Sequence, residues 1–264
     1  MRAVKVRCVQ NAGTTGATIT GATLNTTASG TVTVRATVIN GATINTNYVK
    51  DFPITVTEMP SGEPKQMTLT GSYTGRLGFY LAGTGPVTIN WGNGKVETHT
   101  LMAYDEDTWY NIDGYQYSCP FDVSGAYTVT ITAVNLTHFY CSGLGLTSLD
   151  VSENTALVWL DCQYNSGITT LNLSANTELT YLRCYGLKFT TLDLSANTKI
   201  VEVWAGSNNM QRQAIVDLFV SLHNNPAPEG TWKQIRVEPN PGISTLTAND
   251  VKIAEDKGWF VFWE

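Results

Sequence analysis

The sequence has 264 residues, of which 42% are hydrophobic, an ordinary share for a folded protein and too high for a disordered one. The net charge is −6 with 16 Lys and Arg residues, and no basic run appears, so nucleic acid is not an expected partner. No stretch approaches the roughly 18 apolar residues of a membrane-spanning helix. Strands rich in Thr and Gly with few charges are typical of secreted bacterial surface proteins. We therefore expect an extracellular protein whose export signal is absent from this chain.

Residues 1–58 alternate small turn residues with runs of Thr and Val. The runs at 17–21, 31–39 and 52–57 predict short strands of an all-β sandwich. The phrases at 11–19 and 28–34 resemble the later part of bacterial Ig-like domains. Because the region is short for the roughly seven strands of such a sandwich, we expect a strand or two to be missing before Met1.

A stretch rich in Pro, Gly and Ser at 59–64 predicts a linker before a second β domain at 64–133. The segments 87–94 (V-T-I-N-W-G-N-G), 115–117 (Y-Q-Y) and 125–131 (G-A-Y-T-V-T-I) resemble the landmarks of a PKD-like Ig fold. Asn93 stands where the family's turn usually has Asp, so a cation-linked role of this turn is not expected. The pair Asn93-Gly94 itself predicts a hairpin turn.

The same domain holds two weaker candidate sites. Four carboxylates within nine residues are enough for a weak calcium loop, but the spacing does not match an EF-hand, and a solvated loop is the preferred interpretation. The calcium candidates are Asp105, Asp107 and Asp113, with Glu106 between them. The side chains of Trp91, Trp109 and Tyr110 could line a sugar site, although such aromatics more commonly pack in a sandwich core. No motif predicts a cofactor.

Residues 134–264 contain a repeated pattern that predicts their architecture. Four segments share the order apolar-x-x-apolar-x-Cys/Ala and start 21, 22 and 21 residues apart; they are 136–141, 157–162, 179–184 and 200–205. The first three are each followed by a second shared phrase, such as Leu146-Thr-Ser-Leu149-Asp-Val151-Ser. A period in this range, headed by L-x-x-L-x-(L/C), is the signature of leucine-rich repeats.

Each repeat is too short to bury its own apolar side chains, so successive coils must stack. Apolar residues alternate with variable ones in each opening, which predicts strands that join into a parallel sheet. Cys141, Cys162 and Cys184 share one inward position, and we expect buried free thiols because in-register strands hold equivalent Cβ atoms about 4.8 Å apart, too far for a disulfide. We also expect one asparagine of each repeat to satisfy buried turn backbone. These asparagines are Asn154, Asn176 and Asn197.

From about residue 211 the pattern changes to two helices, each followed by a strand. One helical face carries Ile215, Leu218, Phe219 and Leu222. The segment 247–250 predicts a capping box for a second helix that stops at Gly258. Strands are expected at 234–238 and 259–263. These units should cover the open end of the repeats.

The variable residues of the repeat strands must project from the concave face of the sheet, because the leucines and cysteines point inward. The expected binding residues are His138, Tyr140, Trp159, Asp161, Gln163, Tyr181, Arg183, Tyr185, Glu202 and Trp204, and Ser142, Arg236 and Glu238 extend this set. An exposed aromatic patch flanked by charges predicts ligand recognition. The alternative interpretation is that the rings only pack on one another across neighbouring strands.

No enzymatic activity is expected from this face. Ser142 and His138 lie four residues apart on one strand, about 13 Å at about 3.3 Å per residue, which is too far for a nucleophile and its base. Phosphate-binding, zinc-protease and nucleophile-elbow motifs do not occur in the sequence.

In its order of modules the chain resembles internalin-like leucine-rich-repeat surface proteins of gut-type bacteria that carry Ig-like and PKD-like β domains. The resemblance implies a multidomain fold in which all-β sandwiches precede a short leucine-rich-repeat solenoid with an α/β cap. Leu144 and Leu187 depart from the family pattern, which often has Asn there. The implied function is adhesion to a host or microbial surface protein, with carbohydrate binding or a non-binding structural spacer as alternatives.

Overall fold

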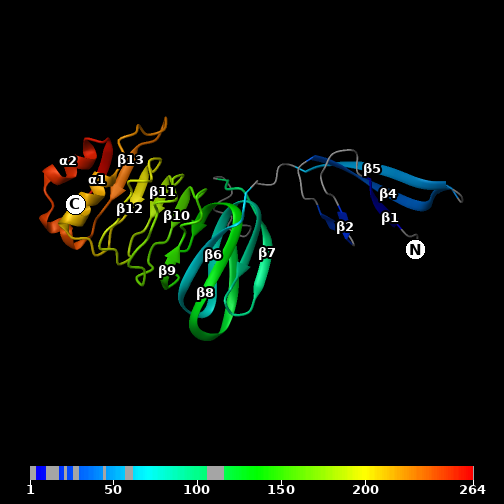
Figure 1. The fold of residues 1–264 in the computed structure, drawn as a ribbon, viewed down its shortest axis with the longest axis horizontal. Helices are drawn as coiled ribbons and strands as arrows, with labels where there is room; N and C mark the ends of the chain where they lie inside the picture. The colour runs from blue at the N-terminus through cyan, green and yellow to red at the C-terminus, as the bar shows by residue number, and fades with distance from the viewer. Residues whose placement is uncertain are drawn as a thin grey trace. The chain divides into compact units, whose positions relative to one another are not determined.

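The computed structural model describes residues 62–105 and 116–263 together with the strands at 4–9, 18–20, 23–25, 30–43 and 46–56 (Figure 1). Side chains are described in the two longer ranges, except at positions 74 and 122. The chain divides into two compact units, Met1–Ser61 and Gly62–Glu264. Both are rich in β-strands, and the second contains one large mixed sheet.

In the first unit, β1 (Val4–Val9), β4 (Gly30–Thr43) and β5 (Thr46–Val56) form an antiparallel sheet in the order β1-β4-β5. A separate hairpin joins β2 (Thr18–Thr20) to β3 (Thr23–Asn25). The expected strands at 17–21, 31–39 and 52–57 are confirmed by β2, β4 and β5, because β-branched Thr and Val suit a pleated backbone. The assignment of an Ig-like domain stays a prediction.

The second unit begins with an antiparallel layer made by β6 (Lys65–Asn90), β7 (Val96–Leu101) and β8 (Gln116–Tyr140). Residues 130–133 of β8 pair with 65–68 of β6 on one side and with 87–90 of β6 on the other. The two halves of β6 therefore flank β8, and β7 pairs with the second half. Large apolar side chains such as Phe79, Trp91 and Ile131 are fully buried in this layer.

The same β8 then starts a parallel sheet. Its last residues, 138–140, pair with β10 (Trp159–Asp161), which is followed in register by β11 (Tyr181–Arg183), β12 (Glu202–Trp204), β13 (Lys233–Arg236) and β14 (Trp259–Phe262). The predicted stack of in-register parallel strands is confirmed. Strand β9 (Leu146–Asp150) instead pairs antiparallel with β6. Because β8 passes residue 133 without interruption, the boundary expected there falls inside a continuous strand.

The inward side chains of the parallel strands form one core. Leu160, Leu182 and Val203 are fully buried at equivalent positions, and the free thiols of Cys141, Cys162 and Cys184 form a buried ladder beside them. Burial raises the pKa of each of these three thiols. They are therefore uncharged small apolar groups that fill the core, as the sequence predicts.

Two ladders of buried asparagines tie successive coils together. Asn176 donates its amide to the carbonyls of Val151 and Asn154 at 2.9 Å, and Asn197 donates to those of Leu173 and Asn176 at 3.1 and 2.8 Å. The structural role expected for these asparagines is confirmed for Asn176 and Asn197, and Asn154 is buried below them in the same row.

A second asparagine ladder lies at the position that Leu144 and Leu187 occupy in other repeats. Asn165 donates to the carbonyls of Cys141 and Cys162, and Asn208 donates to those of Cys184 and Ala205. Each buried amide therefore satisfies the backbone of two neighbouring coils.

Two helices follow the repeats, α1 (Arg212–Ser221) and α2 (Ala248–Glu255), with a short 3₁₀ helix, η2 (Pro241–Thr245), between them. The predicted inner face of α1 is confirmed, since Ile215, Leu218, Phe219 and Leu222 are all buried. The capping box of Thr247 and Asp250 is also confirmed. In Figure 1 the two helices lie together at the end of the unit away from β7.

Candidate binding surface

Alternation along the parallel strands places two rows of side chains on the side opposite the core. The first row is His138, Trp159, Tyr181, Glu202, Gln234 and Phe260, and the second is Tyr140, Asp161, Arg183, Trp204, Arg236 and Phe262. We call this side of the sheet the aromatic face. In-register parallel pairing holds equivalent side chains close enough for direct contact.

The rings at the β8 end of the aromatic face stack on one another. Tyr104, from the segment after β7, covers His138 with ring centres 4.1 Å apart and planes 9° apart. Trp159 stacks on Tyr181 at 4.4 Å and on Tyr140 at 5.7 Å. The faces of these rings are therefore turned toward their neighbours in the sheet.

Two arginines continue the stack toward β14. The guanidinium of Arg183 lies 5.0 Å from the ring centre of Trp159 and 4.3 Å from that of Trp204. Arg236 lies 5.4 Å from Trp204 and 3.9 Å from Phe262. These are cation–π distances, so Trp204 is contacted by a guanidinium from the strand on either side.

Glu202 holds one of these arginines in place. Its Oε1 accepts from Nη2 of Arg183 at 3.1 Å, and its Oε2 accepts from Nε2 of Gln234 at 2.7 Å. Arg183 is aligned with Asp161 in the sheet, yet its ion pair is with Glu202. The positive charge of Arg183 is thereby largely neutralised within the face.

Two ionisable side chains of the aromatic face are buried. His138 is 8% exposed, and burial lowers its pKa to about 4, so the ring is neutral at pH 7. Asp161 is 7% exposed, and burial raises its pKa, while hydrogen bonds from the backbone and side-chain amides of Gln163 oppose that shift. Both groups are part of the packed base of the face and lie below its surface.

The residues expected on the concave face are thus brought together, but they are less exposed than their residue types suggest. His138, Asp161 and Gln163 are buried, and the other seven expected residues are half-buried. These ten residues therefore do not form the freely exposed aromatic patch that the sequence predicts. The reason is that each large side chain covers the neighbour one strand away.

Tyr164 was not among the expected residues, although it is 60% exposed beside the face. It packs edge-on against Tyr185, with ring centres 5.6 Å apart. Its backbone has φ of 56°, in the left-handed region, where the equivalent residues of neighbouring repeats are Gly143 and Gly186. Glycine at those positions was the available sequence signal, because a bulky residue there is strained.

Phe260 and Phe262 were also missed as part of this surface. Phe260 is 61% exposed, and Phe262 is half-buried. Their strand was predicted, but the alternation of inward and outward residues was not carried from β12 as far as β14. The aromatic surface therefore extends over the strands that follow the repeats.

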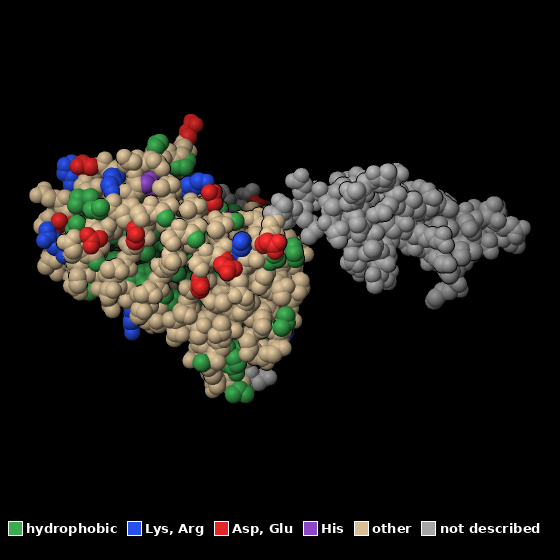
Figure 2. Space-filling model, in the orientation of Figure 1, with side chains coloured by type: hydrophobic (Ala, Val, Ile, Leu, Met, Phe, Trp, Pro, Cys, Tyr) green, Lys and Arg blue, Asp and Glu red, His purple; other side chains and the backbone are tan. Residues whose placement is uncertain are grey.

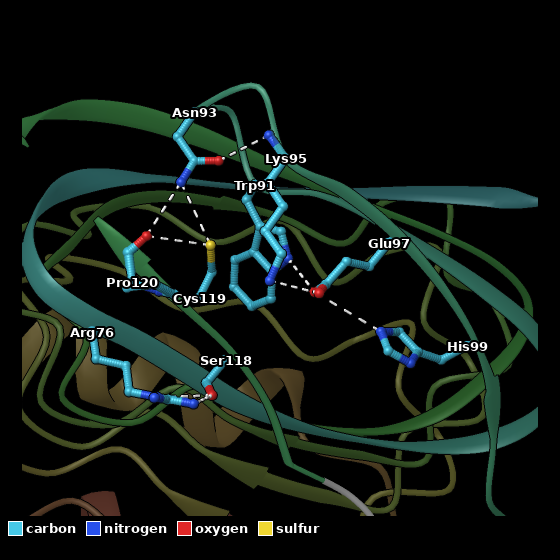
Figure 3. Close-up of polar contacts among 9 residues, drawn as sticks. All are labelled: Arg76, Trp91, Asn93, Lys95, Glu97, His99, Ser118, Cys119 and Pro120. Carbon is cyan, nitrogen blue, oxygen red and sulfur yellow. Dashed lines mark hydrogen bonds and ion pairs between the residues drawn. The ribbon is translucent and has the colours of Figure 1, made fainter. Parts of the chain in front are cut away.

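The turn at 91–94 has a structural role (Figure 3). Trp91 is fully buried, stacks on Phe79 and donates its indole N–H to Glu97 at 2.8 Å. The core role preferred for this aromatic is therefore confirmed for Trp91, and the alternative of a sugar-binding residue is wrong. Asn93 donates its side-chain amide to the carbonyl of Pro120 at 3.4 Å and accepts from the Lys95 backbone at 3.1 Å. A carboxylate at position 93 could not make the first of these bonds.

The calcium loop expected at Asp105, Asp107 and Asp113 lies mainly outside the described residues. Asp105 alone is described, and it is exposed. Within 62–105 and 116–263, no group of three His, Cys, Asp or Glu side chains is placed to hold a metal ion. The calcium hypothesis stays a prediction, as do the sugar-site roles of Trp109 and Tyr110, which also lie outside these ranges.

No family model and no curated protein matches this sequence. Among solved structures, the functional domain of the internalin InlJ from Listeria monocytogenes, described as including a cysteine ladder, is similar at 21% identity and a TM-score of 0.30. The similarity covers 38% of this chain and 27% of the InlJ chain, so this chain spans about a quarter of that structure's length. In the part of the chain that the structure describes, helices with the length and apolar character of a membrane span are absent.

Proposed function

We propose that this protein is an extracellular adhesion protein of the internalin-like type and that its aromatic face contacts a protein ligand. In this proposal the parallel strands and their turns are a leucine-rich-repeat solenoid, α1 to β14 are its cap, and the aromatic face is its concave side. The antiparallel layer of β6 to β8 is a PKD-like domain, and residues 1–58 are an Ig-like domain. The period of 21 to 22 residues and the asparagine ladders support this assignment.

The observation that carries the proposal is the orientation of the rings. Sugars stack on the flat faces of aromatic side chains, but the faces of Trp159 are covered by Tyr181, Tyr140 and Arg183. Those of Trp204 are covered by two guanidinium groups. The rings present edges, whose apolar C–H groups fit the packed side chains of a protein surface.

Carbohydrate binding remains the second candidate because of Tyr164. Its ring is 60% exposed and is contacted edge-on by Tyr185, which leaves aromatic surface on which a sugar could stack. If Tyr164 alone supported binding, the ligand would be a glycan held beside the aromatic face and not across it.

The test compares binding to a glycan array with binding to purified host-cell surface proteins. The variant is Trp159→Ala with Tyr181→Ala, which removes two stacked rings of the aromatic face. The matched control is Tyr127→Ala, a half-buried tyrosine of the antiparallel layer. We expect protein binding that the double variant loses and the control retains, with thermal unfolding showing that both are folded.

Other outcomes contradict the proposal in different ways. A folded double variant that binds protein unchanged would show that the aromatic face is not the site. Glycan binding that only Tyr164→Gly removes would favour the second candidate. No binding in either assay would indicate a structural spacer.

A further inference from the structure

Among the described residues of the second unit, strand β14 is a free edge of the mixed sheet. It pairs with β13 on one side, and no strand among the described residues lies on its other side. Its residues Trp259–Phe262 and the next residue, Trp263, read Trp-Phe-Val-Phe-Trp, without a charge or a proline. Natural proteins usually protect such an edge with charged residues, proline or a covering segment, because free backbone groups recruit other strands.

The opposite edge of the same sheet shows that protection. Strand β7 carries Glu97, His99 and two threonines, and Glu97 forms an ion pair with Lys95 at 2.6 Å. In β14 the corresponding outward positions carry Phe260, which is 61% exposed, and Phe262. The two edges of the sheet thus differ in charge and in exposed apolar surface.

The backbone direction of β14 follows from one hydrogen bond. The Val237 N–H donates to the Phe262 carbonyl at 3.0 Å, so the backbone groups of Phe262 point toward β13. Because direction alternates along a strand, those of Val261 point toward the free edge. The strand is also held firmly, since Trp259 is 2% exposed and donates its indole N–H to the His223 carbonyl.

The sequence of this edge is a palindrome centred on Val261, and from this we propose that β14 pairs antiparallel with β14 of a second copy of the chain across a twofold axis. Val261 would exchange both backbone hydrogen bonds with its equivalent, as the outward direction of its backbone requires. Phe260 would face Phe262 of the other copy twice, and Trp259 would face Trp263. Every cross-strand pair then joins two identical residue types, the self-complementarity that a twofold interface needs.

The edge itself carries no charge that would oppose its pairing with a second copy. Each chain carries a formal charge of −6, which opposes association over most of its surface, but residues 259–263 contribute none of it. The guanidinium of Arg236, on β13, lies 3.9 Å from the ring centre of Phe262. This positive group is therefore beside the proposed interface and not within it. Figure 2 shows charged side chains scattered over the face in view.

The geometry has a consequence for the aromatic face. A twofold axis perpendicular to the sheet keeps Phe260 and Phe262 of both copies on the same side, so the two aromatic faces join into one continuous surface. If the proposed function holds, this surface is bivalent, and a ligand with two sites would bind with increased avidity. The pairing of β14 itself does not depend on the proposed function and is tested without a ligand.

The experiment is sedimentation of the full chain over about 1–100 µM, with Phe260→Lys as the variant. We expect a monomer–dimer equilibrium whose dissociation constant rises at least tenfold in the variant, because each Lys lies against a ring of the other copy. Val123→Lys, at a valine that is 69% exposed in β8, is the matched control and should dimerise as the wild type does.

A second experiment tests the register of the proposed pairing between the two β14 strands. A mixture of Phe260→Lys and Phe262→Glu should recover dimerisation, because the mixed pair joins one Lys to one Glu and one Phe to one Phe. A wild-type chain that stays monomeric to about 100 µM would overturn the proposal. So would open-ended assemblies larger than a dimer, an equal effect of Val123→Lys, or a mixture no better than its components, provided that thermal unfolding shows each variant folded.

Discussion

The guanidinium of Arg183 lies 4.3 Å from the ring centre of Trp204 on the next strand, while Glu202 fixes its orientation through a 3.1 Å ion pair. The same guanidinium contacts Trp159 on the preceding strand. One side chain therefore connects three strands of the aromatic face. Since stacking uses the planar shape of arginine as well as its charge, a lysine would not replace it.

Arg183→Lys should lower the free energy of unfolding by about 1 kcal/mol, because the charge is kept while the planar stacking on two indole rings is lost. Urea unfolding measures this. Lys199→Ala, which breaks the exposed ion pair with Glu178, is the control and should cost less than about 0.5 kcal/mol. Equal effects of the two changes would contradict a structural role for the stack.

His138 predicts a loss of stability in acid. Its pKa is lowered to about 4 in the folded protein from 6.5, so between these values the unfolded chain binds a proton that the folded chain does not. Stability from this group is therefore present above pH 6.5 and falls by up to about 3 kcal/mol as the pH drops toward 4.

The check for His138 is the difference between wild type and His138→Phe in urea unfolding at pH 7, 6, 5 and 4. The free energy of unfolding of the variant, minus that of the wild type, should increase as the pH falls. His223, whose pKa is also lowered by burial, is present in both proteins and cancels. A difference that does not vary with pH would show that the His138 ring is accessible to water.

Asp161 predicts the opposite pH dependence. Its pKa is raised by burial, so the folded state favours the protonated carboxyl, and that contribution to stability is lost as the pH rises through the folded value. Asp161→Asn should therefore be at least as stable as the wild type at pH 7, because Gln163 can turn its amide to pair with Asn. Urea unfolding at pH 7 and pH 4 should show that the stability of the variant relative to the wild type decreases in acid. A variant less stable than the wild type at pH 7 would show that the negative charge of Asp161 stabilises the folded protein.

The asparagine ladder should be sensitive to single changes. Asn176→Ala removes one of the two hydrogen bonds that the carbonyls of Val151 and Asn154 each accept, leaving only the bonds from the backbone N–H groups of Asn154 and Leu157. We expect a loss of about 2 kcal/mol in the free energy of unfolding, because two buried hydrogen bonds are lost. The control is Asn172→Ala, an exposed asparagine that accepts from Ser174, which should cost less than about 1 kcal/mol. Comparable losses in thermal unfolding would argue against the ladder.

Two substitutions at Tyr164 test whether the backbone of this residue, beside the aromatic face, is strained. Tyr164→Gly and Tyr164→Ala remove the same ring, but only Gly relieves the cost of φ at 56°. The Gly variant should be more stable than the Ala variant by about 1 kcal/mol. Thermal unfolding of the pair measures this difference, and equal stabilities would show that the position is not strained.

The sequence by itself determined the elements that depend on repeated or local patterns. The spacing of Leu160, Leu182 and Val203 predicts the stacked strands, because only one phase of a 21-residue repeat buries all of its apolar residues. The capping box at Thr247 could be predicted for a similar reason, since a helix cap is formed by residues three apart in the chain.

Only the tertiary structure decided which side chains are exposed. Trp91 and His138 could each have been surface residues from their sequence context, but Phe79 covers the first and Tyr104 the second, from other strands or segments. Exposure depends on what packs against a residue in the folded protein, and these two partners lie 12 and 34 residues away in the chain, beyond the reach of a local pattern.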